Sequence, residues 1–259
     1  MPDHAQQNAA ILDQFGKQAP SYAQLILRNP DPGLAPLLET AHPTPDDRML
    51  DVGCGTGRFA VAMAPLVGHV TGVDLTPAML DQARELQENA GVSNVEWRQA
   101  DVTALPFADR AFTLVTCRSM LHHTTSPRAV LAEMSRVCAA GGRIAAADVT
   151  PAAAKACAFD AIEILRDPSH VHALPVEELR AHGASLGLTE IAVRPQQSRL
   201  SLESVLATSF PPEGMMDKVR ELYRRDAESG LDAFDLETRF EDDVIMLTYH
   251  STMVIWRRD

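Results

Sequence analysis

The chain has 259 residues, of which 46% are hydrophobic and 22% are charged, a composition typical of a globular protein with a sizeable core. It carries 23 Lys and Arg residues against 35 Asp and Glu residues, which gives a formal net charge of −12 at pH 7. The basic residues form no cluster. Binding to nucleic acid or to an anionic membrane surface requires clustered Lys and Arg, so the sequence argues against both kinds of partner.

Cysteine usage and hydropathy indicate the compartment. The cysteines show no C-x-x-C spacing, so neither a disulfide framework nor a zinc site is indicated. No apolar run is long enough to span a bilayer, and the polar N-terminus lacks the apolar segment of a signal peptide. We therefore expect a cytoplasmic protein without a metal, and we leave open whether it is a monomer or a homodimer.

The first 45 residues are predicted to be mostly helical. Residues 5–28 have the apolar spacing of a helix, which we expect to break near Gly16 and Pro20. The run Pro-Thr-Pro-Asp-Asp at 43–47 is a predicted linker. Because these segments precede the first core strand, we interpret residues 1–45 as an N-terminal helical cap on a single domain that spans residues 1–259.

Residues 46–150 show the pattern of an α/β core, in which short apolar runs alternate with helical patterns. Thr76-Pro77 and Ser126-Pro127 are typical helix starts, whereas Gly91 and Gly141-Gly142 are typical helix ends. Alternation of this length predicts a Rossmann-like, doubly wound and mostly parallel sheet. The predicted strands are residues 48–52, 69–74, 94–99, 112–117 and 143–149.

The regular alternation of strand and helix changes after residue 150, and residues 151–259 are expected to complete the second half of the sheet. The last segment, Tyr249–Arg257, alternates well enough to be a final antiparallel strand at the sheet edge. The other predicted elements are helices at 152–166 and 176–187, a strand at 190–194 and a helical insertion at about 201–230.

The stretch Asp51-Val-Gly-Cys-Gly-Thr-Gly57 joins a strand to a helix through glycines at alternate positions. Such a turn lets the backbone bend sharply and leaves room for a ligand. A dinucleotide site would need G-x-G-x-x-G, but Arg58 stands where the third glycine belongs. Asp51 would also repel a phosphate, whereas it suits the ammonium group of S-adenosylmethionine (SAM). The turn therefore predicts a SAM site rather than a dinucleotide site.

Two further acids follow the next two strands, at the end of the sheet where open α/β folds bind ligands. Asp74 can accept both ribose hydroxyls of an adenosine, although it could also be a solvated residue at a strand end. Asp101 can accept from the adenine amino group while the backbone of Val102 reads the ring edge; the alternative is a loop-capping Asp. Leu75 and Met79 would contact the adenosine, and Met79 could equally belong to the helix core. Three acids matched to ammonium, ribose and adenine are far more specific than any one of them.

With these residues in view, the chain resembles the class I SAM-dependent methyltransferases. More narrowly, it resembles the small-molecule methyltransferases of ubiquinone and menaquinone biosynthesis. The resemblance is strong within residues 46–150, where it is carried by Asp51–Gly57, Val73–Leu75, Ala100–Val102, Cys117–His123 and Leu131–Gly142. It is weaker outside this core, in Phe15–Tyr22 and Arg166–His170.

The resemblance implies SAM as the cofactor. It implies that Tyr22 closes over the methionine end of SAM and that Arg118 lines the methyl-transfer face. No motif identifies the insertion at 201–230, which leaves the substrate open. The turn residues that the resemblance places beside the cofactor are Gly53, Cys54, Gly55 and Gly57.

A base that removes a proton from the acceptor would come from the nine histidines. His122 and His123 follow the fourth strand on the ligand side of the sheet; either could be a general base, with His123 the first choice, or could only pack locally. His170 and His172 lie on a predicted lid loop, and His170 is a further candidate. Their H-x-H spacing has no third ligand nearby, so no metal site is predicted. His4 and the remaining histidines are predicted to be surface or structural residues.

The sequence thus predicts SAM-dependent methyl transfer to carbon or oxygen of a small, partly apolar acceptor. The fourth strand is not followed by Asn-Pro-Pro-Tyr, which argues against nucleobase and glutamine substrates. Two alternatives remain open. One is a SAM-fold enzyme that catalyses a rearrangement or an elimination, and the other is a non-catalytic partner protein that binds SAM or S-adenosylhomocysteine (SAH).

Overall fold

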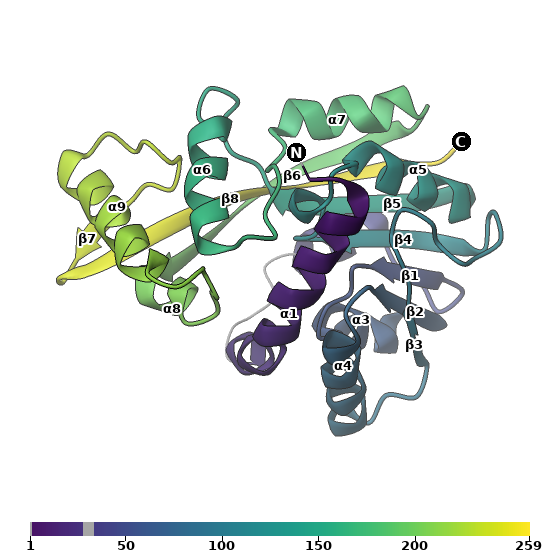
Figure 1. Cartoon of the computed structure of the whole chain (residues 1–259). Coiled ribbons are helices and arrows are strands. Elements are labelled where there is room, and N and C mark those ends of the chain that lie inside the picture. The colour runs from purple at the N-terminus through teal and green to yellow at the C-terminus, as the bar shows by residue number, and fades with distance from the viewer. Residues whose placement is uncertain (1, 28–33) are drawn as a thin grey trace.

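The computed structural model describes residues 2–27 and 34–259, and the side chains of residues 2–20 and 34–259. The strands of these residues form one mixed sheet with helices on both faces (Figure 1). The strands are β1 (Arg48–Val52), β2 (His69–Asp74), β3 (Val95–Gln99), β4 (Phe112–Arg118), β5 (Cys138–Val149), β6 (Thr189–Ser201), β7 (Arg239–Glu241) and β8 (Val244–Arg257).

The helices precede, connect and follow these strands. Two single 3₁₀ turns, Ala64–Leu66 and Leu121–His123, add to them. None of the described helices is both long and apolar enough to cross a membrane. The helices are α1 (His4–Leu27), α2 (Leu34–Ala41), α3 (Arg58–Met63), α4 (Pro77–Ala90), α5 (Pro127–Val137), α6 (Ala156–Arg166), α7 (Val176–Ser185), α8 (Leu202–Leu206) and α9 (Met215–Ser229).

The sheet has the strand order β3-β2-β1-β4-β5-β8-β6, with β7 paired to β8. The first five strands are parallel, whereas β8 runs antiparallel to β5 and β6. This arrangement confirms the predicted Rossmann-like, mostly parallel sheet. Asp51 pairs with Gly72 of β2 and with Thr116 of β4, so the carboxyl ends of the three central strands lie at one edge.

The last strand was expected at the sheet edge, and this prediction is wrong. β8 lies between β5 and β6, and β6 forms the edge. The reason is visible in the uninterrupted apolar run Met253–Trp256, which is at most 1% exposed because both faces of the strand are covered. Strands β6 and β8 extend beyond the other strands to a group made of α6, α8, α9 and β7 (Figure 1).

Two helix boundaries also differ from expectation. The first helix, α1, continues through Gly16 and Pro20. One of its faces is held by buried side chains that include Gln7 and Gln14, and such packing outweighs the local cost of a glycine and a proline. Helix α5 ends at Val137, and Gly141-Gly142 lie inside β5, where the pairing with β4 shifts register.

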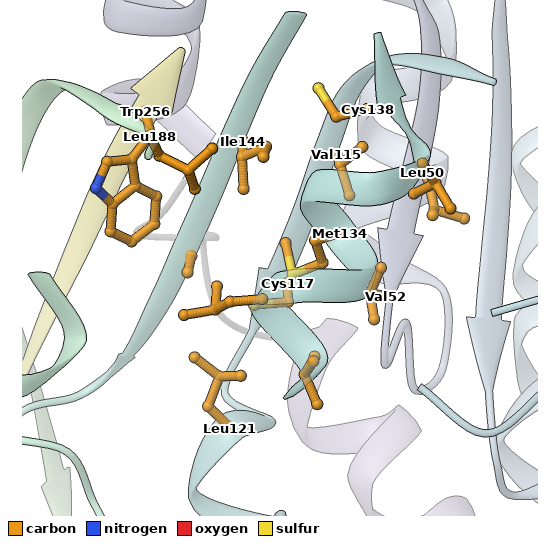
Figure 2. Packing of buried hydrophobic residues seen from close by; sticks show 14 of the residues in the cluster. Leu50, Val52, Val115, Cys117, Leu121, Met134, Cys138, Ile144, Leu188 and Trp256 are labelled. Atoms are coloured by element: carbon orange, nitrogen blue, oxygen red, sulfur yellow. The ribbon is translucent and has the colours of Figure 1, made fainter. Parts of the chain in front are cut away.

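Apolar side chains of alternating strand positions fill both faces of the sheet. Leu50 and Val115 pack on the face covered by α5 and α7, whereas Met49 packs on the face covered by α2 and α3. Figure 2 shows Met134 of α5 directed toward the strands, with Trp256 of β8 at the far side of the same cluster. Full burial of each such side chain contributes roughly 1.5–3 kcal/mol to the stability of the fold. This packing holds the strands, and therefore their ends, in place.

Gly183 of α7 allows the helix to approach β8 closely. A Cβ at this position would lie 2.5 Å from Nε1 of Trp256. We therefore expect Gly183→Ala to lower the free energy of unfolding by about 1–3 kcal/mol, because overpacking displaces core atoms. Gly16 is the matched control, since a Cβ there meets nothing within 4 Å. Gly16→Ala should raise the free energy of unfolding by roughly 0.5–1 kcal/mol. Urea unfolding measures both values, and a similar change in the two variants would contradict this packing.

Candidate active site

A pocket of about 200 Å³ lies at the carboxyl ends of the parallel strands, with the first half of α1 along one side. Ile11 and Phe15 are among the α1 side chains that line it. The sequence-predicted residues that line this pocket are Asp51, Gly53, Cys54, Gly55, Asp74, Leu75, Met79, Asp101, Val102, Arg118 and His123.

Three predicted site residues are placed differently, and a fourth lies outside the described side chains. Gly57, His122 and His170 do not line this pocket. Tyr22 lies on α1, but its side chain falls outside the described side chains, so its role stays a prediction.

The glycines of the turn after β1 have different tasks. Gly55 has a φ of 53°, and a Cβ there would meet nothing within 4 Å, so this position leaves open space beside the pocket. Gly57 has a φ of 76°, and a Cβ there would lie 2.6 Å from Trp97 and 2.7 Å from Ala83. Gly57 therefore serves the packing of the turn against its neighbours rather than the pocket wall.

Asp51 and Asp74 are held at the pocket by short hydrogen bonds. Asp51 is 3% exposed and accepts from the hydroxyl of Thr116 at 2.8 Å. Asp74 accepts from the backbone N–H groups of Gly55 and Thr76, each at 2.8 Å. Burial raises the pKa of Asp74 above its ordinary value, while these two N–H groups act in the opposite direction. Asp74 thus joins the turns that follow β1 and β2.

The carboxylate of Asp101 contacts residues from its own loop and from α1. Thr103 donates to Oδ1 from its backbone N–H at 2.8 Å and from its hydroxyl at 2.6 Å. His4 and Asn8 contact Oδ2 at 2.7 Å and 2.9 Å. Burial alone would raise the pKa of Asp101, but these hydrogen bonds lower it to about 2, so the carboxylate is ionised at neutral pH. His4 is exposed, as expected, and it also lines the pocket.

Arg118 at the end of β4 and Cys54 in the loop before α3 also line the pocket. The guanidinium of Arg118 lies 4.5 Å from the ring centroid of Phe59, a cation–π contact. Burial raises the pKa of the Cys54 thiol well above its usual range, with further increases from Asp74 and Asp51. Cys54 is therefore a neutral thiol and not a nucleophile at this site.

Three histidines cluster beside the pocket, of which His123 and His170 are buried. The ring centroids of His122 and His123 are 4.1 Å apart, and those of His122 and His170 are 5.5 Å apart. His122 contacts Asp148 at 2.5 Å, and His170 contacts Asp160 at 2.7 Å. These two histidines are thus engaged away from the pocket, whereas His123 lines it. Among the described residues, no group of three or more His, Cys, Asp or Glu side chains is arranged to hold a metal ion.

The pKa values of the two neighbouring histidines are shifted in opposite directions. Burial lowers the pKa of His123 to about 3, and the charge of His122 acts in the same direction. Burial would also lower the pKa of His122, but Asp148 raises it above its ordinary value. His123 is consequently neutral at physiological pH.

The fold is that of a Rossmann-like α/β protein, and its pocket lies at the carboxyl ends of the parallel strands, where open α/β sheets bind ligands. A family model described as a methyltransferase domain matches residues 50–146. The chain is 34% identical over 171 residues to an uncharacterized methyltransferase, YcgJ of Bacillus subtilis, a match that covers 64% of this chain and 67% of the relative. It is 39% identical over 102 residues to a demethylmenaquinone methyltransferase of Clavibacter sepedonicus, covering 39% of this chain and 41% of the relative.

A solved structure agrees with the sequence relatives. The crystal structure of the Bacillus subtilis YcgJ protein superimposes with a TM-score of 0.78 at 25% identity, and the match covers 87% of this chain and 98% of that one. The chain belongs to the SAM-dependent methyltransferases.

The low pKa of His123 makes a prediction about stability. Below pH 6.5 the unfolded chain gains a proton that the folded chain does not, so the free energy of unfolding falls as the pH drops from about 6.5 toward about 3. Each pH unit costs at most about 1.4 kcal/mol. We expect His123→Gln to flatten this decline. Urea unfolding at pH 6.5 and pH 5 tests this, and parallel declines in the variant and the wild type would contradict it.

Proposed function

We propose that the chain transfers the methyl group of SAM to carbon or oxygen of a small, partly apolar acceptor in the pocket beside α1. The observation that carries this proposal is the convergence of Asp51, Asp74 and Asp101 on the same pocket as the neutral His123. Three acids there match the polar groups of SAM, and a neutral imidazole can take a proton.

The cofactor end of the pocket is assigned by its chemistry. Asp51 would hold the ammonium group, Asp74 the ribose hydroxyls and Asp101 the adenine amino group. The ionised state of Asp101 and the open space at Gly55 support this orientation. When bound, SAM supplies a methyl group that its sulfonium already activates. The residues of the chain then need only position the two partners and exclude water, which can lower the barrier by ~7–11 kcal/mol.

The acceptor end of the pocket is assigned from the lining residues that are not assigned to SAM. Ile11, Phe15, Phe59 and Met120 give it apolar surface, and Arg58 and Arg118 add positive charge. Among the described residues, the carboxylates that line the pocket are the three assigned to SAM. This lining supports an acceptor with an apolar body. His123 would remove the proton from an acceptor hydroxyl or an acidic C–H group, which favours methylation on oxygen or carbon.

Proteins with similar folds catalyse methyl transfer and also other reactions. The [4+2]-cyclase SpnF shares the fold at a TM-score of 0.57 and 19% identity, and a geranyl diphosphate C-methyltransferase with bound SAH does so at 0.56 and 18%. Likeness at this identity concerns the fold alone. Formation of SAH together with a methylated acceptor is therefore the deciding evidence for the proposed reaction.

Ligand binding tests the cofactor assignment. Isothermal calorimetry should show that both SAM and SAH bind, because each carries the ammonium, ribose and adenine groups that the three acids match. NAD should give no heat of binding, since Asp51 would oppose its phosphates. Incubation with SAM and a panel of phenols and 1,3-dicarbonyl compounds should then produce SAH. Binding of NAD without binding of SAM would overturn the proposal.

Asp74 provides the sharpest single variant. Asp74→Ala should weaken SAH binding about ten- to a hundredfold, because a hydrogen bond to a charged group contributes roughly 1.5–3 kcal/mol. Asp81→Ala is the matched control, since it removes one negative charge from exposed surface outside the pocket. An SAH affinity within twofold of the wild type in Asp74→Ala would mean that Asp74 only joins the two turns.

A further inference from the structure

Ser169 contacts the imidazole of His123 on one nitrogen. Both its hydroxyl oxygen and its backbone carbonyl oxygen lie 3.1 Å from Nδ1 of His123. Ser169 is fully buried and His123 is 7% exposed, so bulk water does not compete for these contacts. The loop that carries Ser169 follows α6 and is far from His123 in sequence. This contact was not foreseen from the sequence, which predicted a lid loop with His170 as its candidate base.

The hydroxyl hydrogen of Ser169 is already committed to another residue. Ser169 donates it to Oδ1 of Asp167 at 2.6 Å, and the backbone N–H of Ser169 donates to the same oxygen at 2.9 Å. The Ser169 hydroxyl therefore presents only lone pairs to His123, as its carbonyl does. A hydrogen on Nδ1 satisfies both contacts, which leaves Nε2 as the unprotonated ring nitrogen.

Asp167 is a buried carboxylate within reach of this pair. It is 5% exposed. Burial would raise its pKa, but the hydrogen bonds from Ser169 and the charge of Arg166 hold the pKa of Asp167 below its ordinary value. Asp167 is therefore an anion at the far end of a chain that runs through Ser169 to His123.

Helix α1 fixes the two backbone segments of this chain against each other. The side-chain amide of Gln7 donates to the backbone oxygen of His123 and to that of Ser169, each at 2.7 Å. Gln7 is 3% exposed. Because one amide group bridges both carbonyls, the distance between His123 and Ser169 is set independently of any ligand.

We propose that Ser169 and Asp167 are positioning residues for His123, with Ser169 holding the Nδ1–H tautomer and Asp167 supplying a counter-charge through the Ser169 hydroxyl. This inference rests on the proposed function, and it assigns roles to two residues outside the pocket lining. In the neighbouring pairs His122–Asp148 and His170–Asp160, the carboxylate contacts its histidine directly, without a bridging hydroxyl.

Protons and electrons balance in the proposed methyl-transfer step. Nε2 of His123 takes the proton of the acceptor hydroxyl or C–H group while the acceptor atom forms its bond to the methyl carbon. The sulfur keeps the electron pair of the bond that breaks, so positive charge passes from the sulfonium to the imidazolium. Asp167 stabilises this imidazolium through Ser169, and Nδ1 keeps its hydrogen throughout.

Tautomer measurement tests the geometry without any acceptor. Long-range proton–nitrogen NMR spectra of protein with isotope-labelled histidine, assigned with His123→Gln, should show a neutral His123 with its hydrogen on Nδ1 at pH 7. A hydrogen on Nε2, or a protonated ring, would overturn the proposal. This readout stands even if no acceptor is methylated, so its failure is distinct from failure of the proposed function.

Methylation rates test whether Ser169 and Asp167 act as positioning residues for His123. The substrates are SAM and a series of phenols of graded acidity. The variants are Asp167→Asn, which removes the charge at constant size, and Ser169→Ala, which removes the hydroxyl that bridges His123 and Asp167. Both should slow methylation of weakly acidic phenols about ten- to a hundredfold, within the range of general-base effects, and leave phenols that are already ionised within about threefold. In a His123→Ala background, Asp167→Asn should cause no further decrease in the methylation rate.

Asp160→Asn is the matched control, because it neutralises a carboxylate of the same histidine cluster that contacts His170 and His172 instead. Its rates should follow the wild type for every phenol. Equal slowing of all phenols by Asp167→Asn and Ser169→Ala would show a merely structural role and overturn the proposal, as would unchanged rates in both.

Discussion

The site depends on the carboxylate of Asp74, which accepts one backbone N–H group from each of two turns. The donors belong to Gly55, after β1, and to Thr76, after β2. Parallel pairing of the two strands brings these turns to the same edge, and the carboxylate then fixes their separation. The position of the glycine turn, and with it Asp51 and the mouth of the pocket, follows from this pair of bonds.

Helix α1 completes the site from outside the sheet. It contributes polar contacts at two places, through His4 and Asn8 to Asp101 and through Gln7 to the segments of His123 and Ser169. Further along the helix, Gln14, Gln18 and Ala19 are buried, and this packing explains how α1 stays helical through Gly16 and Pro20. Its side chains are held by specific partners, so the helix does not rely on local propensity alone.

The parts of the fold that depend on local pattern could be predicted from the sequence. The bounds of β1 and β2 follow from short apolar runs, and α4 follows from Pro77 and the left-handed Gly91 that ends it. The three acids could be placed because each directly follows a strand. The interior place of β8 was missed because an alternating segment was taken as half-exposed, although Met253–Trp256 is continuously apolar.

The missed site residues share a different cause. Ser169 and Asp167 reach His123 only through the path of the chain after α6, which no spacing in the sequence reveals. His4 and Asn8 are one helical turn apart, so their common face could have been read from α1, but not that Asp101 would lie beneath it. Gly57 was assigned to the ligand because the turn looks uniform in sequence, whereas the packing of Trp97 and Ala83 sets its size.

The crowded carboxylate of Asp101 has an energetic consequence for any ligand that approaches it. Two oxygens offer about four lone-pair positions, and Thr103, His4 and Asn8 already direct four donors at them. A fifth donor cannot simply be added, so an incoming amino group would have to replace a contact from α1. The net gain at this residue is then that of an exchange between two hydrogen bonds, which is smaller than that of a bond formed to a free carboxylate. Recognition at Asp101 would thereby contribute more to selecting the ligand than to the tightness of its binding.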